Sequence, residues 1–161
     1  AAQERTMPIE VYPDDLGSPD AQSIVAEHLS GMHGNSPAGH VHALAIDGLK
    51  APGTTFWTAW SDGQLCGCGA LKQLTAESGE VKSMRTRTAF LRQGVGQAVL
   101  ETIMQAAQDR GYARLYLETG TGAAFEAAHA LYLRNGFAWC GAFGDYEATA
   151  FNVFMVKALQ A

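Results

Sequence analysis

Apolar residues along this chain recur at two spacings. In some segments every second residue is apolar, which is typical of strands, and in others every third or fourth residue is, which is typical of helices. Runs rich in apolar and β-branched residues predict strands at 9–12, 54–60, 65–74, 80–86, 113–119, 137–141 and 152–159. Helical spacing with start and stop residues predicts helices from about 18 to 32 and at 41–49, 95–110 and 123–135. The turn Ser61-Asp62-Gly63 indicates a hairpin between two of the strands.

These elements give the order β-α-α-β-β-β-α-β-α-β-β. The stretch 80–135 alternates strand, helix, strand, helix, which implies a parallel pair of strands joined by a crossover. Antiparallel hairpins are expected on either side of that pair. We therefore expect an α/β (α+β) protein with a mixed, mostly antiparallel sheet, flanked by about four helices and folded as a single domain over residues 1–161.

A glycine-containing turn, Arg92-Gln93-Gly94-Val95-Gly96, joins the strand at 80–86 to the helix at 95–110. Glycines let a backbone approach a ligand closely, and the start of a helix presents unpaired N–H groups and a positive dipole. Arg85, Arg87 and Arg92 add positive charge to the same segment. The pattern predicts a site for a phosphate group.

Composition and charge indicate which classes of ligand and which cellular compartment to expect. The net charge of −5, with 17% charged residues, disfavours nucleic-acid binding, which needs a basic face. No apolar run approaches the length of a membrane span, and the polar first residues give no signal peptide. The three cysteines, Cys66, Cys68 and Cys140, indicate reduced thiols, so we expect a cytoplasmic protein with no membrane partner.

The turn fits neither of two common phosphate-binding motifs. A nucleotide-hydrolase loop ends in Gly-Lys-Ser/Thr, and no such segment occurs. A dinucleotide-binding turn needs a third glycine or alanine where this chain has Val99, and it belongs in a first βαβ unit rather than after a hairpin.

The block of strand, RQGVGQ and helix, followed by LYLETG and ALYLRNGF, resembles the GNAT acetyltransferase superfamily, which binds acetyl-CoA. The resemblance is strong over 80–137. Gly94 and Gly96 fill the last fixed positions of its Q/R-x-x-G-x-G/A signature, whereas Leu91 replaces the first. Phe125 stands where many relatives carry asparagine. The resemblance implies the GNAT-like acyl-CoA N-acyltransferase fold, in which the parallel pair splays apart.

The resemblance also implies which residues hold acetyl-CoA, a co-substrate that needs no metal. Backbone groups of Met84, Arg85 and Thr86 would bind the pantetheine arm. Amides of the turn would cradle the pyrophosphate; they belong to Arg92, Gln93, Gly94, Val95, Gly96 and Gln97.

Direct acetyl transfer needs a proton donor for the departing thiolate and a base for the amine. Tyr132 aligns with the tyrosine that often supplies the proton in the family, although a tyrosine there could also simply pack its helix on the sheet. Glu80 and Glu118 are the candidate bases, Glu118 slightly favoured because it ends a strand. Either glutamate could instead be a solvated residue or the partner of a nearby cation.

Residues that could line the acceptor side are scattered along the chain. His42, together with His33 and His40, surrounds a loop where the family usually builds its acceptor site. Of Trp57 and Trp60, on opposite faces of one strand, one could line a pocket. Lys72, Lys82 and Arg85 could hold a carboxylate, which would indicate an anionic acceptor such as an amino acid.

We therefore expect an acetyl-CoA-dependent N-acetyltransferase that acts on a primary amine of a small molecule by direct attack in a ternary complex. Two alternatives stay open: acetylation of a protein N-terminus or lysine, and a non-catalytic acyl-CoA-binding sensor. Another acyl donor would also fit. The strand at 152–159 could pair across a homodimer.

Overall fold

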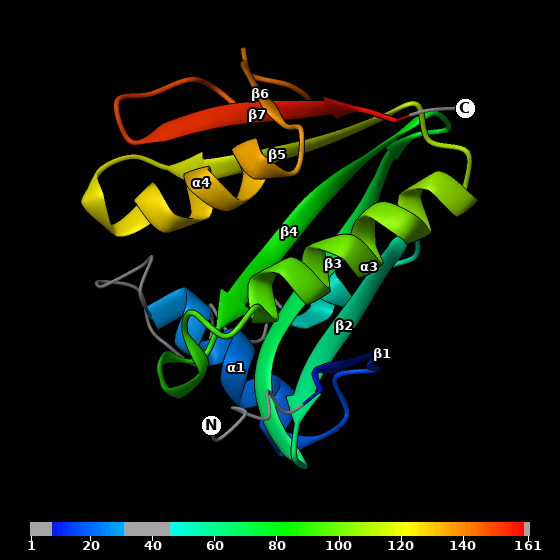
Figure 1. Ribbon diagram of the computed structural model, residues 1–161. Coiled ribbons are helices and arrows are strands. Elements are labelled where there is room, and N and C mark those ends of the chain that lie inside the picture. Colours follow the sequence, from blue (N-terminus) through cyan, green and yellow to red (C-terminus); the bar gives the residue numbers. More distant parts are fainter. Residues whose placement is uncertain (1–7, 31–45, 160–161) are drawn as a thin grey trace, which may run out of the picture. The chain divides into compact units, whose positions relative to one another are not determined.

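The structure is a computed structural model in which residues 8–30 and 46–159 are described (Figure 1). Its elements are β1 (Glu10–Pro13), α1 (Pro19–Ser30), β2 (Thr54–Ser61), β3 (Gln64–Thr75), β4 (Ser78–Thr86), η1 (Thr88–Phe90), α3 (Val95–Asp109), β5 (Arg114–Gly120), η2 (Ala123–Phe125), α4 (Glu126–Arg134), β6 (Ala138–Cys140) and β7 (Asn152–Ala158). Residues 46–49 are also helical, and the rest of the helix predicted at 41–49 lies outside the described residues. The other predicted elements are confirmed to within a few residues.

The strands are hydrogen bonded in the order β1-β2-β3-β4-β5-β7-β6. β4 and β5 run parallel, with Glu80 opposite Tyr116 and Val81 opposite Leu117. The pairs β1–β2, β5–β7 and β6–β7 are antiparallel. The predicted mixed sheet with a parallel pair inside antiparallel neighbours is confirmed, and the parallel register sets Glu80 beside the strand that carries Glu118.

β7 lies inside the sheet rather than at its edge. It pairs with β5 along its whole length and with β6 from Phe154 to Val156. The residues Phe154–Val156 therefore have partner strands on both sides, and the expectation that this C-terminal strand pairs across a homodimer stays a prediction. The sequence pattern alone could not show that β6 folds back onto β7.

Contacts divide the chain into two compact units. Unit 1 comprises Ala1–Ala70 and Ser83–Thr102, and unit 2 comprises Leu71–Lys82 and Ile103–Ala161. β3, β4 and α3 each begin in one unit and end in the other. The expectation of a single domain over 1–161 stays a prediction, and each unit has a buried core of its own.

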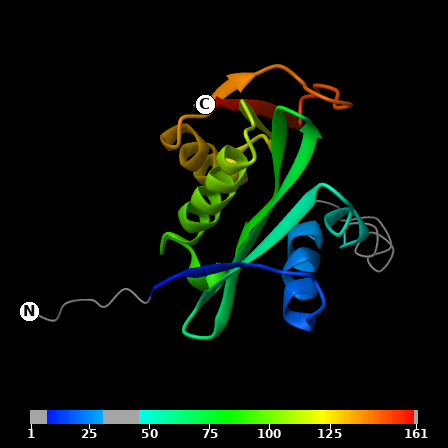
Figure 2. The same cartoon turned by 90° about the vertical axis from the view of Figure 1, so that its right-hand side faces the viewer.

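The core of unit 1 forms where α1 packs its apolar face. Ala21, Ile24 and Val25 of that helix are buried in a cluster with Leu16 and Phe56. The helix begins where the sequence predicts, because the Ser18 hydroxyl oxygen accepts a hydrogen bond from the amide of Ala21. The edge strand β1 leads directly into α1 (Figure 2).

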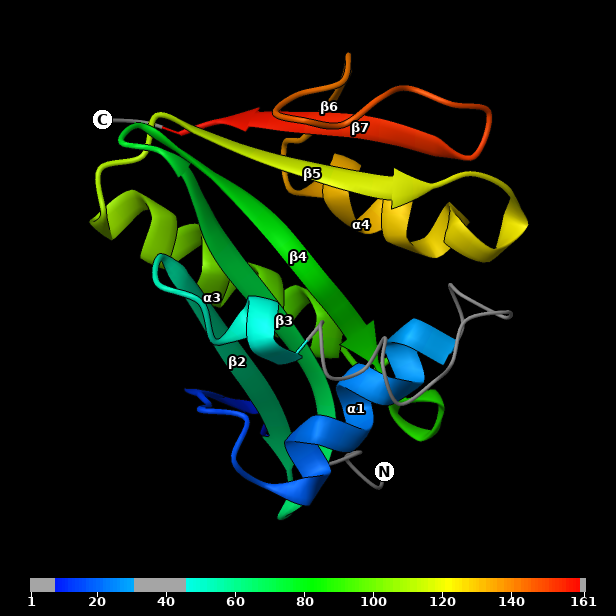
Figure 3. The ribbon, with the colours of Figure 1, turned by 180° about the vertical axis from the view of Figure 1, so that it is seen from behind.

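The core of unit 2 is built on β5 and β7. Leu115 and Leu117 alternate along β5 and are 0% and 1% exposed, and Met155 of β7 is 0% exposed. α4 covers one face of these two strands, in front of them in Figure 1 and behind them in Figure 3. Tyr116 and Glu118 alternate with the buried Leu115, Leu117 and Thr119 along β5, so their side chains point to the other face.

Gly67 marks a close approach within unit 1. A Cβ atom at this position would lie 2.5 Å from Cγ1 of Val95 and 2.9 Å from the backbone oxygen of Arg85. Because one of these neighbours is backbone, it has little freedom to give way. We expect Gly67→Ala to lower the free energy of unfolding by about 1–3 kcal/mol, measured by urea denaturation.

Gly48→Ala is the matched control, because nothing lies within 4 Å of the added methyl and the residue is helical. Its free energy of unfolding should be equal to or slightly above that of the wild type. Equal urea midpoints for Gly67→Ala and the wild type would contradict the close packing.

Candidate active site

The predicted phosphate-binding turn lies in unit 1 and is open to solvent. The carbonyl of Gly94 accepts the first helical hydrogen bond, from the amide of Ala98 at 3.0 Å, so α3 begins at Val95. Arg92 and Gly94 both have left-handed backbones, with φ of +64° and +84°. The first amides of a helix have no carbonyl partner within the helix, so the N–H groups of this turn can donate hydrogen bonds to an anion.

The strand that leads to the turn is not regular. Ser83, in the middle of β4, has φ of +56°, and its carbonyl accepts a hydrogen bond from the Cys68 thiol at 3.2 Å. A left-handed residue interrupts the two-residue alternation of a strand. The alternation of side chains between the two faces of β4 is therefore interrupted at Ser83.

The two arginines of this strand end differ in their hydrogen bonds. The Arg87 guanidinium donates to the Ser23 hydroxyl at 2.5 Å, which ties it to α1. Nε of Arg85 is buried and has no hydrogen-bond partner within the described part of the chain. A buried donor of this kind is uncommon, and a bound anion or carbonyl would satisfy it.

In unit 2, Glu80 is a buried carboxylate with two partners. The residue is 3% exposed, and its Oε2 accepts a hydrogen bond from the Tyr146 hydroxyl at 2.6 Å. Lys82 Nζ lies 3.8 Å from the same oxygen and donates to the Tyr146 hydroxyl at 3.3 Å. The Lys82 side chain is 34% exposed and that of Glu80 is 4% exposed, so solvent reaches the lysine more easily than the carboxylate.

Glu118 is tied to the start of β7. Its Oε2 accepts a hydrogen bond from Nδ2 of Asn152 at 2.8 Å, and the same amide nitrogen donates to the carbonyl of Glu147 at 3.0 Å. The side-chain oxygen of Asn152 accepts from both the amide and the hydroxyl of Thr149. The loop 141–151 between β6 and β7 therefore bonds to Glu80 through its own Tyr146, and it is linked to Glu118 through Asn152, the first residue of β7.

Aromatic rings hold Tyr146 in place. Its ring contacts those of Phe143 and Phe154 at centroid distances of 5.1 and 5.8 Å, and Phe143 contacts Tyr116 at 4.9 Å. Burial raises the pKa of the Tyr146 phenol, and its hydrogen bond to Glu80 and the charges of Glu80 and Glu118 raise it further. The phenol therefore stays protonated and acts as a hydrogen-bond donor. Tyr146 was not identified from the sequence because 141–151 has no periodicity that places it, and Asn152 was assigned only to a strand.

Tyr132 lies in α4 and is 6% exposed. Its ring contacts that of Phe137 at 5.7 Å, and burial raises the pKa of its phenol to about 12. No hydrogen bond or ring contact joins Tyr132 to Glu80, Glu118 or Tyr146 in the described residues. The structure thus brings the two glutamates to one loop and keeps Tyr132 as a separate, protonated phenol.

The remaining predicted acceptor residues are dispersed. His42 lies outside the described residues. Trp57 is 5% exposed in β2, so its ring is in the interior of unit 1, whereas Lys72 is exposed on β3 in unit 2. Among these residues, only Lys82 joins the Glu80 cluster in the described part of the chain.

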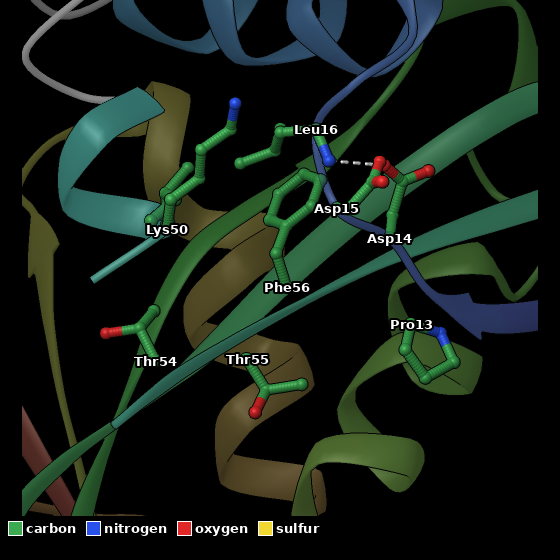
Figure 4. A pocket seen from close by; sticks show the side chains of 9 residues that line it. Pro13, Asp14, Asp15, Leu16, Lys50, Thr54, Thr55 and Phe56 are labelled. Atoms are coloured by element: carbon green, nitrogen blue, oxygen red, sulfur yellow. Dashed lines mark hydrogen bonds between the residues drawn. The ribbon is translucent and has the colours of Figure 1, made fainter. Parts of the chain in front are cut away.

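A hollow of about 440 Å³ lies in unit 1 and is lined in part by Asp14 and Asp15 (Figure 4). Its two carboxylates are engaged by the turn that precedes α1. Asp14 accepts hydrogen bonds from the amide of Leu16 and the hydroxyl of Thr58, and Asp15 accepts one from the amide of Gly17. These contacts make the hollow a structural feature of the turn rather than a second reactive site.

Within the described residues, 8–30 and 46–159, no group of three His, Cys, Asp or Glu side chains is placed to hold a metal ion. No helix there is long and apolar enough to cross a membrane.

Comparison with known proteins identifies sequence relatives. The sequence model described as the acetyltransferase (GNAT) family matches residues 14–137. The chain is 48% identical to the uncharacterized N-acetyltransferase YsnE of Bacillus subtilis, over 91% of this chain and 97% of YsnE. It is 49% identical to the uncharacterized N-acetyltransferase YedL of Escherichia coli, over 88% and 89%. An IAA acetyltransferase of Azospirillum brasilense is 36% identical over 76% of this chain and 80% of its own.

Solved structures share the fold at lower sequence identity. An acetyltransferase from Streptococcus agalactiae superposes with a TM-score of 0.73 and 18% identity, covering 96% of this chain and 99% of its own. A GNAT family acetyltransferase from Elizabethkingia anophelis, solved with acetyl-CoA bound, has a TM-score of 0.68 and 17% identity, covering 94% and 98%. The predicted acyl-CoA N-acyltransferase fold is confirmed.

Burial of Tyr132 has a consequence for stability at alkaline pH. The folded pKa of about 12 lies above the ordinary tyrosine value of about 10, so the unfolded chain loses this proton first as the pH rises. The stabilisation is complete below about pH 10 and is lost between about pH 10 and 12. Over that window we expect the free energy of unfolding to fall more steeply in the wild type than in Tyr132→Phe, by up to about 1.4 kcal/mol per pH unit.

Urea denaturation at a series of pH values measures both slopes. Tyr146 contributes to both proteins equally and cancels in the comparison. Parallel pH dependences for the two proteins would contradict the raised pKa of Tyr132.

Proposed function

The chain belongs to the GNAT family of acetyltransferases, and on that premise we propose that it transfers the acetyl group of acetyl-CoA to a primary amine of a small molecule. The amine attacks the thioester directly in a ternary complex, without an acyl-enzyme. The observation that carries the proposal is the pair of carboxylates on neighbouring strands of unit 2, one of them buried beside a lysine and a protonated phenol.

Binding of the acetyl donor, acetyl-CoA, is assigned to unit 1. The amides of the turn 92–97, in which Arg92 and Gly94 have left-handed backbones, donate hydrogen bonds to the pyrophosphate oxygens. Backbone groups of Met84 and Thr86 hold the pantetheine arm. The unpartnered Nε of Arg85 donates to the bound coenzyme. Leu91 removes one side-chain contact that relatives make, but it does not alter the backbone amides.

The reaction needs a base, an acid and a route for the second proton that the nitrogen loses. A carboxylate, Glu80 or Glu118, takes a proton from the acceptor's ammonium, and the neutral nitrogen forms a bond to the acetyl carbon as the bond from carbon to sulfur breaks. Tyr132 donates its proton to the departing thiolate, and the second proton that the nitrogen loses as the amide forms returns to the Tyr132 phenolate. A phenol is protonated at neutral pH at its ordinary pKa of about 10, and burial raises the pKa of Tyr132 further, to about 12.

The acceptor carries a carboxylate as well as an amine. The Lys82 ammonium is the partly exposed cation of the Glu80 cluster, and it can pair with a substrate carboxylate close to the base. Lys72, exposed on β3, provides a second cation in the same unit. A relative named for the acetylation of IAA, rather than of a protein, also supports a small molecule as the acceptor.

Thiol release from acetyl-CoA, measured over a panel of amines and amino acids, tests the activity. We expect turnover with the wild type and a fall in kcat of about 100-fold or more in Tyr132→Phe, because a proton donor contributes on that scale. Tyr112→Phe is the matched control, since Tyr112 is also 6% exposed in unit 2. Binding of acetyl-CoA without turnover on any amine or peptide would favour the sensor alternative instead.

The acceptor class is tested by Lys82→Met against Lys72→Met. We expect Lys82→Met to raise KM for amino-acid acceptors by about 10-fold or more, because a charge-assisted hydrogen bond to the carboxylate is lost. KM for amines without a carboxylate should change little, and Lys72→Met should have the smaller effect on both classes. Equal losses for charged and uncharged acceptors in Lys82→Met would contradict an anionic acceptor, and turnover on a peptide N-terminus or lysine alone would favour the protein alternative.

A further inference from the structure

Glu80 is poorly placed to meet an acceptor directly. The residue is 3% exposed, and its Oε2 is already bonded to the Tyr146 hydroxyl. Tyr146 comes from the loop 141–151 and is only partly buried. Its hydroxyl is therefore a hydrogen-bonded link through which a proton can reach this oxygen of Glu80.

We propose that Tyr146 relays the acceptor's proton to Glu80. The proposal rests on the proposed function, and it selects Glu80 rather than Glu118 as the base. It also assigns a catalytic role to a loop residue that is outside the sequence motif.

The proton balance of the relay is simple. The acceptor's ammonium gives a proton to Oη of Tyr146 while the phenolic proton of Tyr146 moves to Oε2 of Glu80. The products are a neutral amine, a neutral phenol and a carboxylic acid, so no phenolate forms. Burial and the two glutamates raise the pKa of Tyr146, which agrees with a phenol that passes a proton on without ionising. Glu80 returns its proton to solvent after the product leaves.

The structure already contains the chain of hydrogen bonds that such a relay needs. Lys82 Nζ donates to Oη of Tyr146 at 3.3 Å, and the same hydroxyl donates to Glu80 at 2.6 Å. An ammonium, a phenol and a carboxylate are thus linked in series, with the phenol accepting on one side and donating on the other. Because a hydroxyl oxygen has two lone pairs, an acceptor's ammonium can bond to Oη beside Lys82.

Other charged groups around Tyr146 are few. Glu80 and Lys82 face it from β4 and the charge of Glu118 acts on it from β5, whereas β7 contributes the apolar ring of Phe154. On its own loop, Asp145 and Glu147 flank it and are exposed. Of these groups, the Glu80 carboxylate is the one that receives a hydrogen bond from the phenol.

Tyr146→Phe removes the relay and keeps the ring that packs on Phe143 and Phe154. We expect kcat/KM for the best amine of the panel to fall about 100-fold at neutral pH. The deficit should narrow as the pH approaches the acceptor's own pKa, because the amine then arrives neutral. Tyr116→Phe is the matched control: it removes a hydroxyl from the same aromatic cluster, and we expect a kcat/KM within about twofold of the wild type, since no hydrogen bond joins that hydroxyl to Glu80.

Glu80→Gln provides a second variant and a double-mutant cycle. If the two residues act as one relay, Tyr146→Phe/Glu80→Gln should be about as slow as either single variant, since effects within a unit do not multiply. Circular dichroism and acetyl-CoA binding show that each variant is folded.

The outcomes separate the relay from the proposed function. A wild type that acetylates no amine overturns both. An active wild type with an unchanged Tyr146→Phe, a deficit that is constant across pH, or losses that multiply in the double variant overturns the relay alone.

Discussion

The arrangement of strands and loop in unit 2 depends on the hydrogen bond that Tyr146 donates to one buried carboxylate, that of Glu80. A carboxylate without partners in a protein interior costs several kcal/mol, so Glu80 at 3% exposure needs a hydrogen-bond donor. The donor is the Tyr146 hydroxyl at 2.6 Å, and it comes from a loop 66 residues further along the chain. This bond fixes the loop 141–151 against β4, while Asn152 fixes its end against Glu118 on β5. Two neighbouring strands and one loop are therefore joined through two carboxylates.

The same interaction limits the chemistry that these carboxylates can perform. Glu80 has a protonated donor in front of it and Lys82 beside it, whereas Glu118 is held by a neutral amide. Of the two, Glu80 is linked to a group that can carry a proton. The slight preference for Glu118 that follows from its place at a strand end is thus reversed in our proposal, because a carboxylate bonded to an amide has no path for a proton through that bond.

Sequence patterns predicted the architecture well and the contacts of the site poorly. Periodicity located the strands, the helices and the parallel pair, because each depends on local spacing and on the rule for crossover connections. The turn at 92–96 was also found, since glycine and a helix start carry a local signature. The left-handed Ser83 has no such signature, because serine rarely adopts that conformation and tertiary contacts hold it there. Tyr146 was missed for a related reason: its partner is distant in sequence, and loops have no periodicity.

The most direct test of the account compares Glu80→Gln with Glu118→Gln. Both substitutions remove one negative charge from neighbouring parallel strands and keep the shape of the side chain. The rate of acetyl transfer at saturating acetyl-CoA, measured by thiol release near neutral pH, should fall far more in Glu80→Gln, by about 100-fold or more. A larger loss in Glu118→Gln, or equal small losses in both, would contradict Glu80 as the group that receives the acceptor's proton.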